Sequence, residues 1–289
     1  MLTKEEFLKK INNTPLLLDG ATGSNLRAAG MPKDCCTENW VLENPQPLVA
    51  LQRAYARAGS HIVYAPTFQA QPLALDAVGL AAHTERINEA LVALSRSAAP
   101  GCLIAGDLTT MAASLESWDP DNFDTMVAAY RRQIRGLIDG GADLLIGETL
   151  LYPQEAEAIW EAARAENAGA VAFSFTMQSD GTLFTGQDAG KALGELEKLG
   201  AAAVGFNCVA ASEDTPFLVS KLRRHVKGAL ICKPNAGNPV TAPDGSEHYT
   251  MPPESFAAIM KQCRCNGATL LGGCCGTTPA HIAALADIR

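Results

Sequence analysis

Two adjacent cysteines near the C-terminal end of the chain, Cys274 and Cys275, follow an apolar run, and a third cysteine, Cys208, ends an earlier one. Both runs are typical of strands that stop at a cysteine. If the two strands end beside each other in one barrel, three thiolates can converge on a single metal ion. Three soft protein ligands leave the fourth position of a tetrahedral zinc open, as in catalytic rather than closed structural zinc sites.

The cysteine pair also has a purely structural interpretation, in which two small residues fill a tight strand end. Adjacent residues point to opposite sides of a regular strand, which argues against a shared ion. Glycines flank the pair, however, so the backbone is free to leave regular strand geometry there. A second adjacent pair, Cys35 and Cys36, lies in a predicted loop and is a rival candidate for a metal site. The residues alone leave these interpretations open.

Two carboxylates, Asp19 and Glu148, lie at the ends of two other predicted strands. They could be solvated loop residues. If they lie at the same end of a barrel, they could instead hold the cationic amino group of a substrate. The turn formed by Gly20, Ala21 and Thr22 offers backbone N–H groups that could receive a carboxylate. Together these features predict a pocket for an amino acid.

The elements that must position these residues form a repeating pattern of short apolar runs and longer segments with helical periodicity. Eight strands are predicted at residues 16–20, 61–68, 102–108, 142–149, 170–176, 202–208, 229–234 and 268–274. Helices are predicted at residues 48–58, 83–98, 121–139, 153–167, 193–199, 214–227, 253–263 and 279–286.

The predicted strands lack polar alternation, so both of their faces should be covered, as in parallel sheets. Eight strand–helix units in 289 residues predict an α/β fold, a single (β/α)8 barrel domain over residues 1–289. An open doubly wound sheet is the alternative, but no Gly-x-Gly-x-x-Gly motif follows the first strand. Barrel active sites lie at the C-terminal ends of the strands, where the cysteines and carboxylates are predicted.

Composition excludes several classes of function. The formal net charge is −8 and no Lys/Arg cluster is long enough to follow a phosphate backbone, so no nucleic-acid partner is expected. No apolar run reaches the roughly 18 residues of a membrane span. The charged N-terminus lacks the apolar stretch of a signal peptide, and a cytoplasmic location is expected. Nine cysteines in such a chain favour metal binding or catalysis over a disulfide scaffold. His281 is expected on a helix surface.

Three runs of the sequence together resemble the zinc-dependent homocysteine S-methyltransferases. They are Asp-Gly-Ala-Thr-Gly-Ser at 19–24, Gly-Phe-Asn-Cys at 205–208, and Gly-Gly-Cys-Cys-Gly-Thr-Thr-Pro-Ala-His-Ile at 272–282. The resemblance covers nearly the whole chain in the right order, and the last run is specific.

The resemblance implies a (β/α)8 barrel whose Zn²⁺ is held by the three cysteines at 208, 274 and 275, with the sulfur of homocysteine as the fourth ligand. It implies that Asp19 and Glu148 bind the amino group of homocysteine, and that the backbone around Gly20 and Ala21 binds its carboxylate. Asn235 matches a position that can occupy the zinc when substrate is absent. No catalytic residue beyond the zinc site is implied. The implied activity is methyl transfer to the homocysteine thiol, giving methionine.

The run Pro-Asn-Ala-Gly at 234–237 most resembles the homocysteine module of cobalamin-dependent methionine synthase. That enzyme is much longer, so the resemblance implies that a methyl-corrinoid partner protein, or methylcobalamin, supplies the methyl group in trans. S-methylmethionine is the alternative donor, and betaine is a weaker one. An alternative of another class is a non-catalytic zinc-binding barrel that serves as a subunit of a corrinoid complex.

Overall fold

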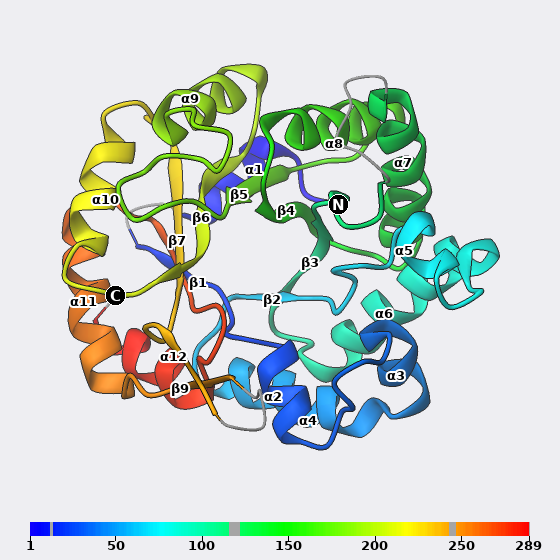
Figure 1. The fold of residues 1–289 in the computed structure, drawn as a ribbon, viewed down its shortest axis with the longest axis horizontal. Coiled ribbons are helices and arrows are strands. Elements are labelled where there is room, and N and C mark those ends of the chain that lie inside the picture. The colour runs from blue at the N-terminus through cyan, green and yellow to red at the C-terminus, as the bar shows by residue number, and fades with distance from the viewer. Residues whose placement is uncertain (12–13, 116–121, 243–246, 289) are drawn as a thin grey trace.

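The computed structural model describes residues 1–11, 14–115, 122–242 and 247–288. In these residues eight parallel strands form a nearly closed barrel surrounded by helices (Figure 1), which confirms the predicted fold class. The strands are β1 (Leu16–Leu17), β2 (Ile62–Tyr64), β3 (Leu103–Thr109), β4 (Leu144–Leu150), β5 (Val171–Phe175), β6 (Ala203–Ala210), β7 (Ala229–Asn235) and β10 (Leu270–Leu271). Their order in the sheet is β1-β10-β7-β6-β5-β4-β3-β2.

A histidine connects the two ends of this sheet, β1 and β2. The backbone N–H of His61 donates to the Leu17 carbonyl at 2.8 Å. In return, the Leu17 N–H donates to His61 Nδ1 at 2.9 Å. The imidazole therefore replaces a backbone acceptor at the seam of the barrel, where a regular ladder is missing among the described residues.

All eight predicted helices are present, although the predicted start of one at residue 121 lies outside the described residues. They are α4 (Pro45–Arg57), α6 (Thr84–Ala98), α7 (Phe123–Asp139), α8 (Pro153–Ala165), α9 (Ala189–Leu199), α10 (Thr215–Arg223), α11 (Pro253–Cys265) and α12 (Pro279–Ala286). The sequence did not predict α1 (Lys4–Lys10), α2 (Gly23–Ala28), α3 (Thr37–Glu43), α5 (Pro72–Asp76) or the 3₁₀ turn η1 (Ala81–His83).

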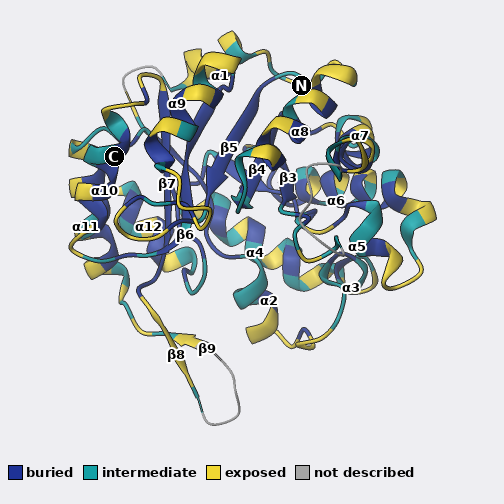
Figure 2. Cartoon of the chain, turned by 45° about the horizontal axis from the view of Figure 1, so that its top comes forward, coloured by how far each residue is buried: buried dark blue, intermediate teal, exposed yellow. Residues whose placement is uncertain are grey.

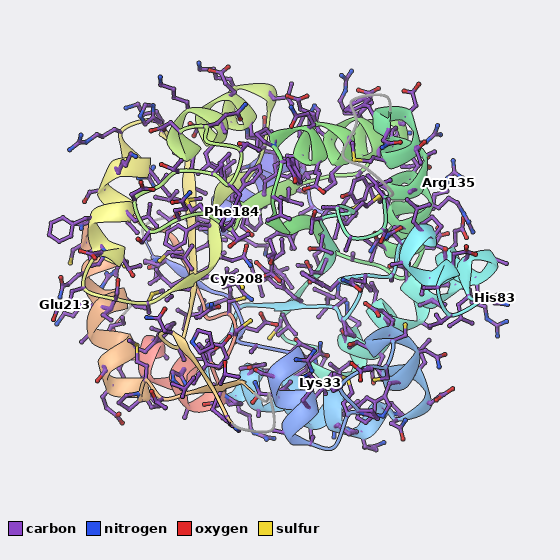
Figure 3. All side chains as sticks on the ribbon, viewed as in Figure 1. Lys33, His83, Arg135, Phe184, Cys208 and Glu213 are labelled. Atoms are coloured by element: carbon purple, nitrogen blue, oxygen red, sulfur yellow. The ribbon has the colours of Figure 1, made fainter. Side chains whose placement is uncertain are left out.

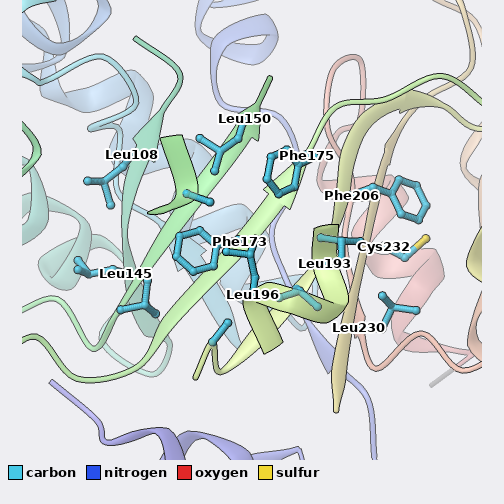
Figure 4. Close-up of a cluster of buried hydrophobic side chains, with 14 of the residues drawn as sticks. Leu108, Leu145, Leu150, Phe173, Phe175, Leu193, Leu196, Phe206, Leu230 and Cys232 are labelled. Carbon is cyan, nitrogen blue, oxygen red and sulfur yellow. The ribbon is translucent and has the colours of Figure 1, made fainter. Parts of the chain in front are cut away.

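The apolar side chains form one layer outside the sheet and another inside the barrel. The outer layer packs strands against helices, with Phe173 and Phe206 of the sheet near Leu193 of α9 (Figure 4). The inner layer contains Ile146 of β4 and Ile231 of β7. Because strand side chains alternate between faces, the residues two positions further along each strand also point inward.

A two-stranded antiparallel hairpin, β8 (Pro239–Thr241) paired with β9 (Glu247–Tyr249), follows β7 and projects from the body of the molecule (Figure 2). Tyr249 lies against Gly276, whose φ of +78° and lack of a side chain permit this close approach. His281 of α12 is buried, and its Nε2 lies 3.0 Å from the Met251 carbonyl. The expected surface position of His281 is therefore wrong, because this histidine holds the end of the hairpin.

None of the helices among the described residues is both long and apolar enough to cross a membrane.

Candidate metal centre and substrate pocket

The three cysteines at 208, 274 and 275 converge at the C-terminal end of the barrel. Their sulfur atoms all lie within 4.8 Å of one another, and Cys208 Sγ is 3.8 Å from Cys275 Sγ. Cys208 lies near the middle of the molecule in the view down the barrel (Figure 3). A tetrahedral zinc with bonds of about 2.3 Å to sulfur has sulfur–sulfur edges of about 3.8 Å. The geometry of the three thiols therefore fits a metal of this kind.

The backbone at Cys208 departs from strand geometry in a way that turns its thiol toward the pair. Cys208 has a φ of +58°, in the left-handed region that residues other than glycine rarely adopt. The register of β6 against β7 also shifts between Asn207 and Ala210. Thr149, at the end of β4, has the same left-handed φ of +58°. Such strain is typical of functional sites, where surrounding contacts enforce it.

Asn207 supplies those contacts. Its Oδ1 accepts hydrogen bonds from the Thr149 N–H and from Ser174 Oγ, both at 2.9 Å. Its Nδ2 donates to Thr149 Oγ1 at 2.6 Å and points to Cys274 Sγ at 3.7 Å. Asn207 thus links β4, β5 and β6 and places an N–H beside a thiol. This role of Asn207 was not predicted from the sequence, although its place directly before Cys208 was a usable signal.

Asn235 joins the backbones that carry two of the cysteines. Its Oδ1 accepts from the Cys275 N–H at 3.0 Å, and its Nδ2 donates to the Cys208 carbonyl at 3.3 Å. The amide therefore fixes the spacing between the end of β6 and the loop that follows β10.

Hydrogen bonds among the thiols distribute their protons unequally. Bonds from Cys208 and Cys274 lower the pKa of Cys275 to about 3, and the Tyr249 side chain adds a further hydrogen bond. The pKa of Cys208 is raised, chiefly by its bonds to the other two thiols. The cluster therefore favours at least one thiolate, the form of cysteine that binds metals.

The turn after β1 is held against the C-terminal cysteine loop. The Ala21 N–H donates to Thr277 Oγ1 at 3.1 Å, and the Thr277 hydroxyl donates to the Cys274 carbonyl at 2.7 Å. A side chain at Gly20 would come within 2.6 Å of the Tyr55 hydroxyl, so only glycine fits there. The Ala21 N–H, which was predicted to bind a substrate carboxylate, thus donates to Thr277 in this structure. Thr22 follows at the start of α2.

The two carboxylates lie on the inner side of the same barrel end, and both are buried. Glu148 continues the inward face of β4, two residues after Ile146. Asp19 follows β1, and its Oδ2 accepts from the Tyr64 N–H at 2.8 Å.

A buried lysine and a third buried carboxylate, neither of them predicted from the sequence, share this space. Lys233 continues the inward face of β7 and places its Nζ 2.9 Å from Glu148 Oε1 and 3.9 Å from Asp19 Oδ1. Nζ also lies 4.7 Å from the centre of the Tyr64 ring. Asp107 of β3 points into the same interior. Charged residues at inward positions near strand ends were the signal that could have identified both.

The charge states of this group follow from burial and from the lysine. Burial raises the pKa of Asp19 to about 7, although Lys233 and the Tyr64 N–H act in the opposite direction. Burial likewise raises the pKa of Glu148, and burial together with the Glu148 charge raises that of Asp107 far above its ordinary value. Burial opposes the charge of Lys233, but Glu148, Cys274 and Asp19 outweigh it and keep its pKa high. Lys233 therefore stays cationic.

The rival cysteine pair does not join the cluster. The Cys35 thiol donates to the Pro32 carbonyl at 3.2 Å, and the Cys36 thiol donates to Glu38 Oε2 at 3.4 Å. Within the described part of the chain, only the cysteines at 208, 274 and 275 form a group that could hold a metal ion.

A barrel with three thiols and several carboxylates at the C-terminal end of its strands is a (β/α)8 protein with a candidate metal centre. Residues 16–289 match the homocysteine S-methyltransferase family, and the chain belongs to it. It is 31% identical to the homocysteine S-methyltransferase of Escherichia coli over 299 residues, covering 93% of this chain and 94% of that protein. It is 28% identical to the methionine synthase of Mycobacterium tuberculosis over 306 residues, covering 98% of this chain but 26% of that protein.

Solved structures agree with the family. The metallated form of the E. coli homocysteine methyltransferase MmuM has a TM-score of 0.81 at 29% identity, covering 96% of this chain and 97% of that one. The carboxyl transferase domain of Rhizobium etli pyruvate carboxylase has a TM-score of 0.53 at 16% identity, covering 94% and 42%, and shows only that the fold is shared.

Proposed function

We propose that this chain transfers a methyl group to the thiol of homocysteine, giving methionine, and that it depends on zinc held by the cysteines at 208, 274 and 275. The observation that carries the proposal is the convergence of three thiols within 4.8 Å of one another at the barrel end that also holds the buried carboxylates. When bound, zinc supplies the Lewis acidity that keeps a substrate sulfur in its nucleophilic thiolate form at neutral pH.

We assign the following roles to the residues of the chain. Asp19 and Glu148 hold the ammonium of homocysteine and so direct its sulfur toward the cysteines. Asn207 donates an N–H toward Cys274 Sγ and fixes the left-handed conformation of its neighbour Cys208. The turn at 20–22 lies beside the cysteine loop and borders the substrate carboxylate. Holding the thiol in line with the methyl donor is the main contribution of these residues to the rate.

For the donor, we propose a methyl-corrinoid protein, with cobalamin bound to that partner. Two observations support it: the similarity to methionine synthases, and the partial exposure of Cys208 and Cys275, which leaves their side of the cluster reachable from the C-terminal face. S-methylmethionine is the second candidate. A small donor that needs no partner protein is supported by the match to 94% of the E. coli homocysteine S-methyltransferase, a protein of about the length of this chain.

Methionine formation tests the proposal. Zinc-loaded protein is incubated with homocysteine and, separately, methylcobalamin, S-methylmethionine or betaine. We expect methionine from at least one donor, loss of activity on chelation, and recovery when zinc is returned. The donor that gives the fastest turnover decides between the two candidates. Zinc-loaded protein that binds homocysteine but makes no methionine from any donor would instead identify a non-catalytic subunit.

A further inference from the structure

An ammonium group of the chain itself occupies the position that the proposed function gives to the ammonium of the substrate. Lys233 Nζ lies 2.9 Å from Glu148 Oε1 and 3.9 Å from Asp19 Oδ1. The Lys233 side chain is 4% exposed, so these ion pairs are shielded from bulk solvent. A substrate ammonium that contacted both carboxylates would meet this charge directly, and two cations at such a distance repel each other strongly in a buried site.

We propose that Lys233 is a specificity-determining residue. Its ammonium occupies the cation-binding position between Asp19 and Glu148 until the amino group of the acceptor thiol displaces it. The inference rests on the proposed function and deepens it. The net gain in binding free energy from an amino group on the acceptor is then only the difference between the energy of its own contacts and the energy of the contacts that Lys233 loses. Selection for the amino group is weaker than the two buried carboxylates would impose by themselves.

The barrel interior contains a second position that could bind the Lys233 ammonium. Asp107 Oδ1 and the Tyr64 hydroxyl are buried and have no hydrogen-bond partner among the described residues. Lys233 Nζ already lies 4.7 Å from the centre of the Tyr64 ring, a cation–π distance. Unsatisfied buried acceptors are costly, and a lysine ammonium that moved toward them would satisfy up to two. Its long, flexible stem allows such a move without a change in the backbone.

The ion pair between Lys233 and Glu148 can also be replaced by a contact with the substrate. Nζ is at ion-pair distance from Glu148 Oε1, and this oxygen has no hydrogen-bond partner among the described residues. An arriving ammonium that donated a hydrogen bond would satisfy the same oxygen. The barrel interior thus offers the Lys233 ammonium two cation-binding positions. In this structure it occupies the one at Asp19 and Glu148, and the other lies at Asp107 and Tyr64.

The experiment compares two thiols that differ only in the amino group. Calorimetry on the zinc-loaded, full chain measures the affinity for homocysteine and for 4-mercaptobutanoate, and their ratio reports selection for the amino group. In Lys233→Met no cation of the protein lies between Asp19 and Glu148, so we expect this ratio to rise at least about tenfold. In Asp107→Asn the displaced lysine finds no second carboxylate, so we expect the ratio to fall. Lys198→Met, whose side chain is 74% exposed, is the matched control and should leave the ratio unchanged.

Three results would overturn the inference: an unchanged ratio in Lys233→Met, a lower ratio in that variant, or an unchanged ratio in Asp107→Asn. If Lys233→Met does not fold, the Asp107→Asn measurement decides by itself. Failure of the inference is distinguishable from failure of the proposed function. If wild-type protein makes methionine but neither variant changes the ratio, only the role of Lys233 is wrong. If zinc-loaded protein binds neither thiol, the proposed function is wrong as well.

Discussion

Lys233 Nζ lies 2.9 Å from Glu148 Oε1, inside the barrel and close enough to Cys274 to interact with it electrostatically. The two residues come from β7 and β4, which are not neighbours in the sheet. They meet because both continue inward faces that carry apolar residues earlier in each strand. Replacing either one would leave an unpaired charge in a buried site, which is costly unless another cation or a proton compensates it.

Removing two of the proposed metal ligands should remove the metal. In Cys208→Ser/Cys275→Ser we expect the zinc content to fall from about one per chain to near zero, because a single cysteine cannot hold the ion. Elemental analysis of purified protein measures it. Cys35→Ser/Cys36→Ser is the matched control and should keep its zinc. Full zinc in the first variant would place the metal elsewhere.

Neutralising Glu148 should weaken binding of homocysteine more than binding of 4-mercaptobutanoate. In Glu148→Gln the substrate ammonium loses a charged acceptor, so we expect a loss of about 1–3 kcal/mol in the binding free energy of homocysteine. Calorimetry on zinc-loaded protein gives both affinities. Glu195→Gln, with a side chain 73% exposed, should change neither. Equal losses for the two thiols would argue against an amino-group contact at Glu148.

Removing the Asn207 amide should loosen the metal and the fold together. Asn207→Ala loses the bonds to Thr149 and Ser174 and the N–H beside Cys274. We expect zinc affinity to fall about 10–100-fold, as for other residues that orient metal ligands, and the unfolding free energy to fall by about 1–3 kcal/mol. Competition with a chelator and chemical denaturation measure the two effects. Asn266→Ala, at the end of α11, should retain wild-type zinc affinity, and a wild-type zinc affinity in Asn207→Ala would contradict the assigned role.

The buried carboxyl of Asp19 should make stability depend on pH. Its pKa is raised from about 3.8 to about 7 in the folded chain, chiefly by burial. The folded chain therefore keeps a proton that the unfolded chain loses, and the stabilisation present below pH 4 is lost as pH rises through 7. In metal-free protein, the unfolding free energy of wild type should fall relative to that of Asp19→Asn between about pH 4 and 7 and then level off. The absence of this relative fall would mean that Lys233 keeps Asp19 ionised, because a carboxyl whose folded pKa is not raised has lost its proton in both states above about pH 4.

The order of the elements could be read from the sequence because it depends on local patterns. Apolar runs without polar alternation predicted buried parallel strands, and all eight are present, although β1 and β10 keep only two residues each. The glycine and proline signals located the eight main helices. The extra helices α2 and α3 and the hairpin β8–β9 lie in loops, where such patterns are weak. Burial against the body of the protein stabilises these elements more than their own periodicity does.

The candidate site divides in the same way. The sequence alone placed Asp19, Glu148 and the cysteines at strand ends, because a strand that stops at a polar residue is a local feature. It could not place Lys233 between the carboxylates, since side-chain alternation gives the face of a strand but not which residues meet across the barrel. Nor could it supply the left-handed φ of Cys208, which the hydrogen bonds of Asn207 to β4 and β5 enforce. Contacts between residues far apart in the chain depend on the closure of the barrel, and only the tertiary structure decides them.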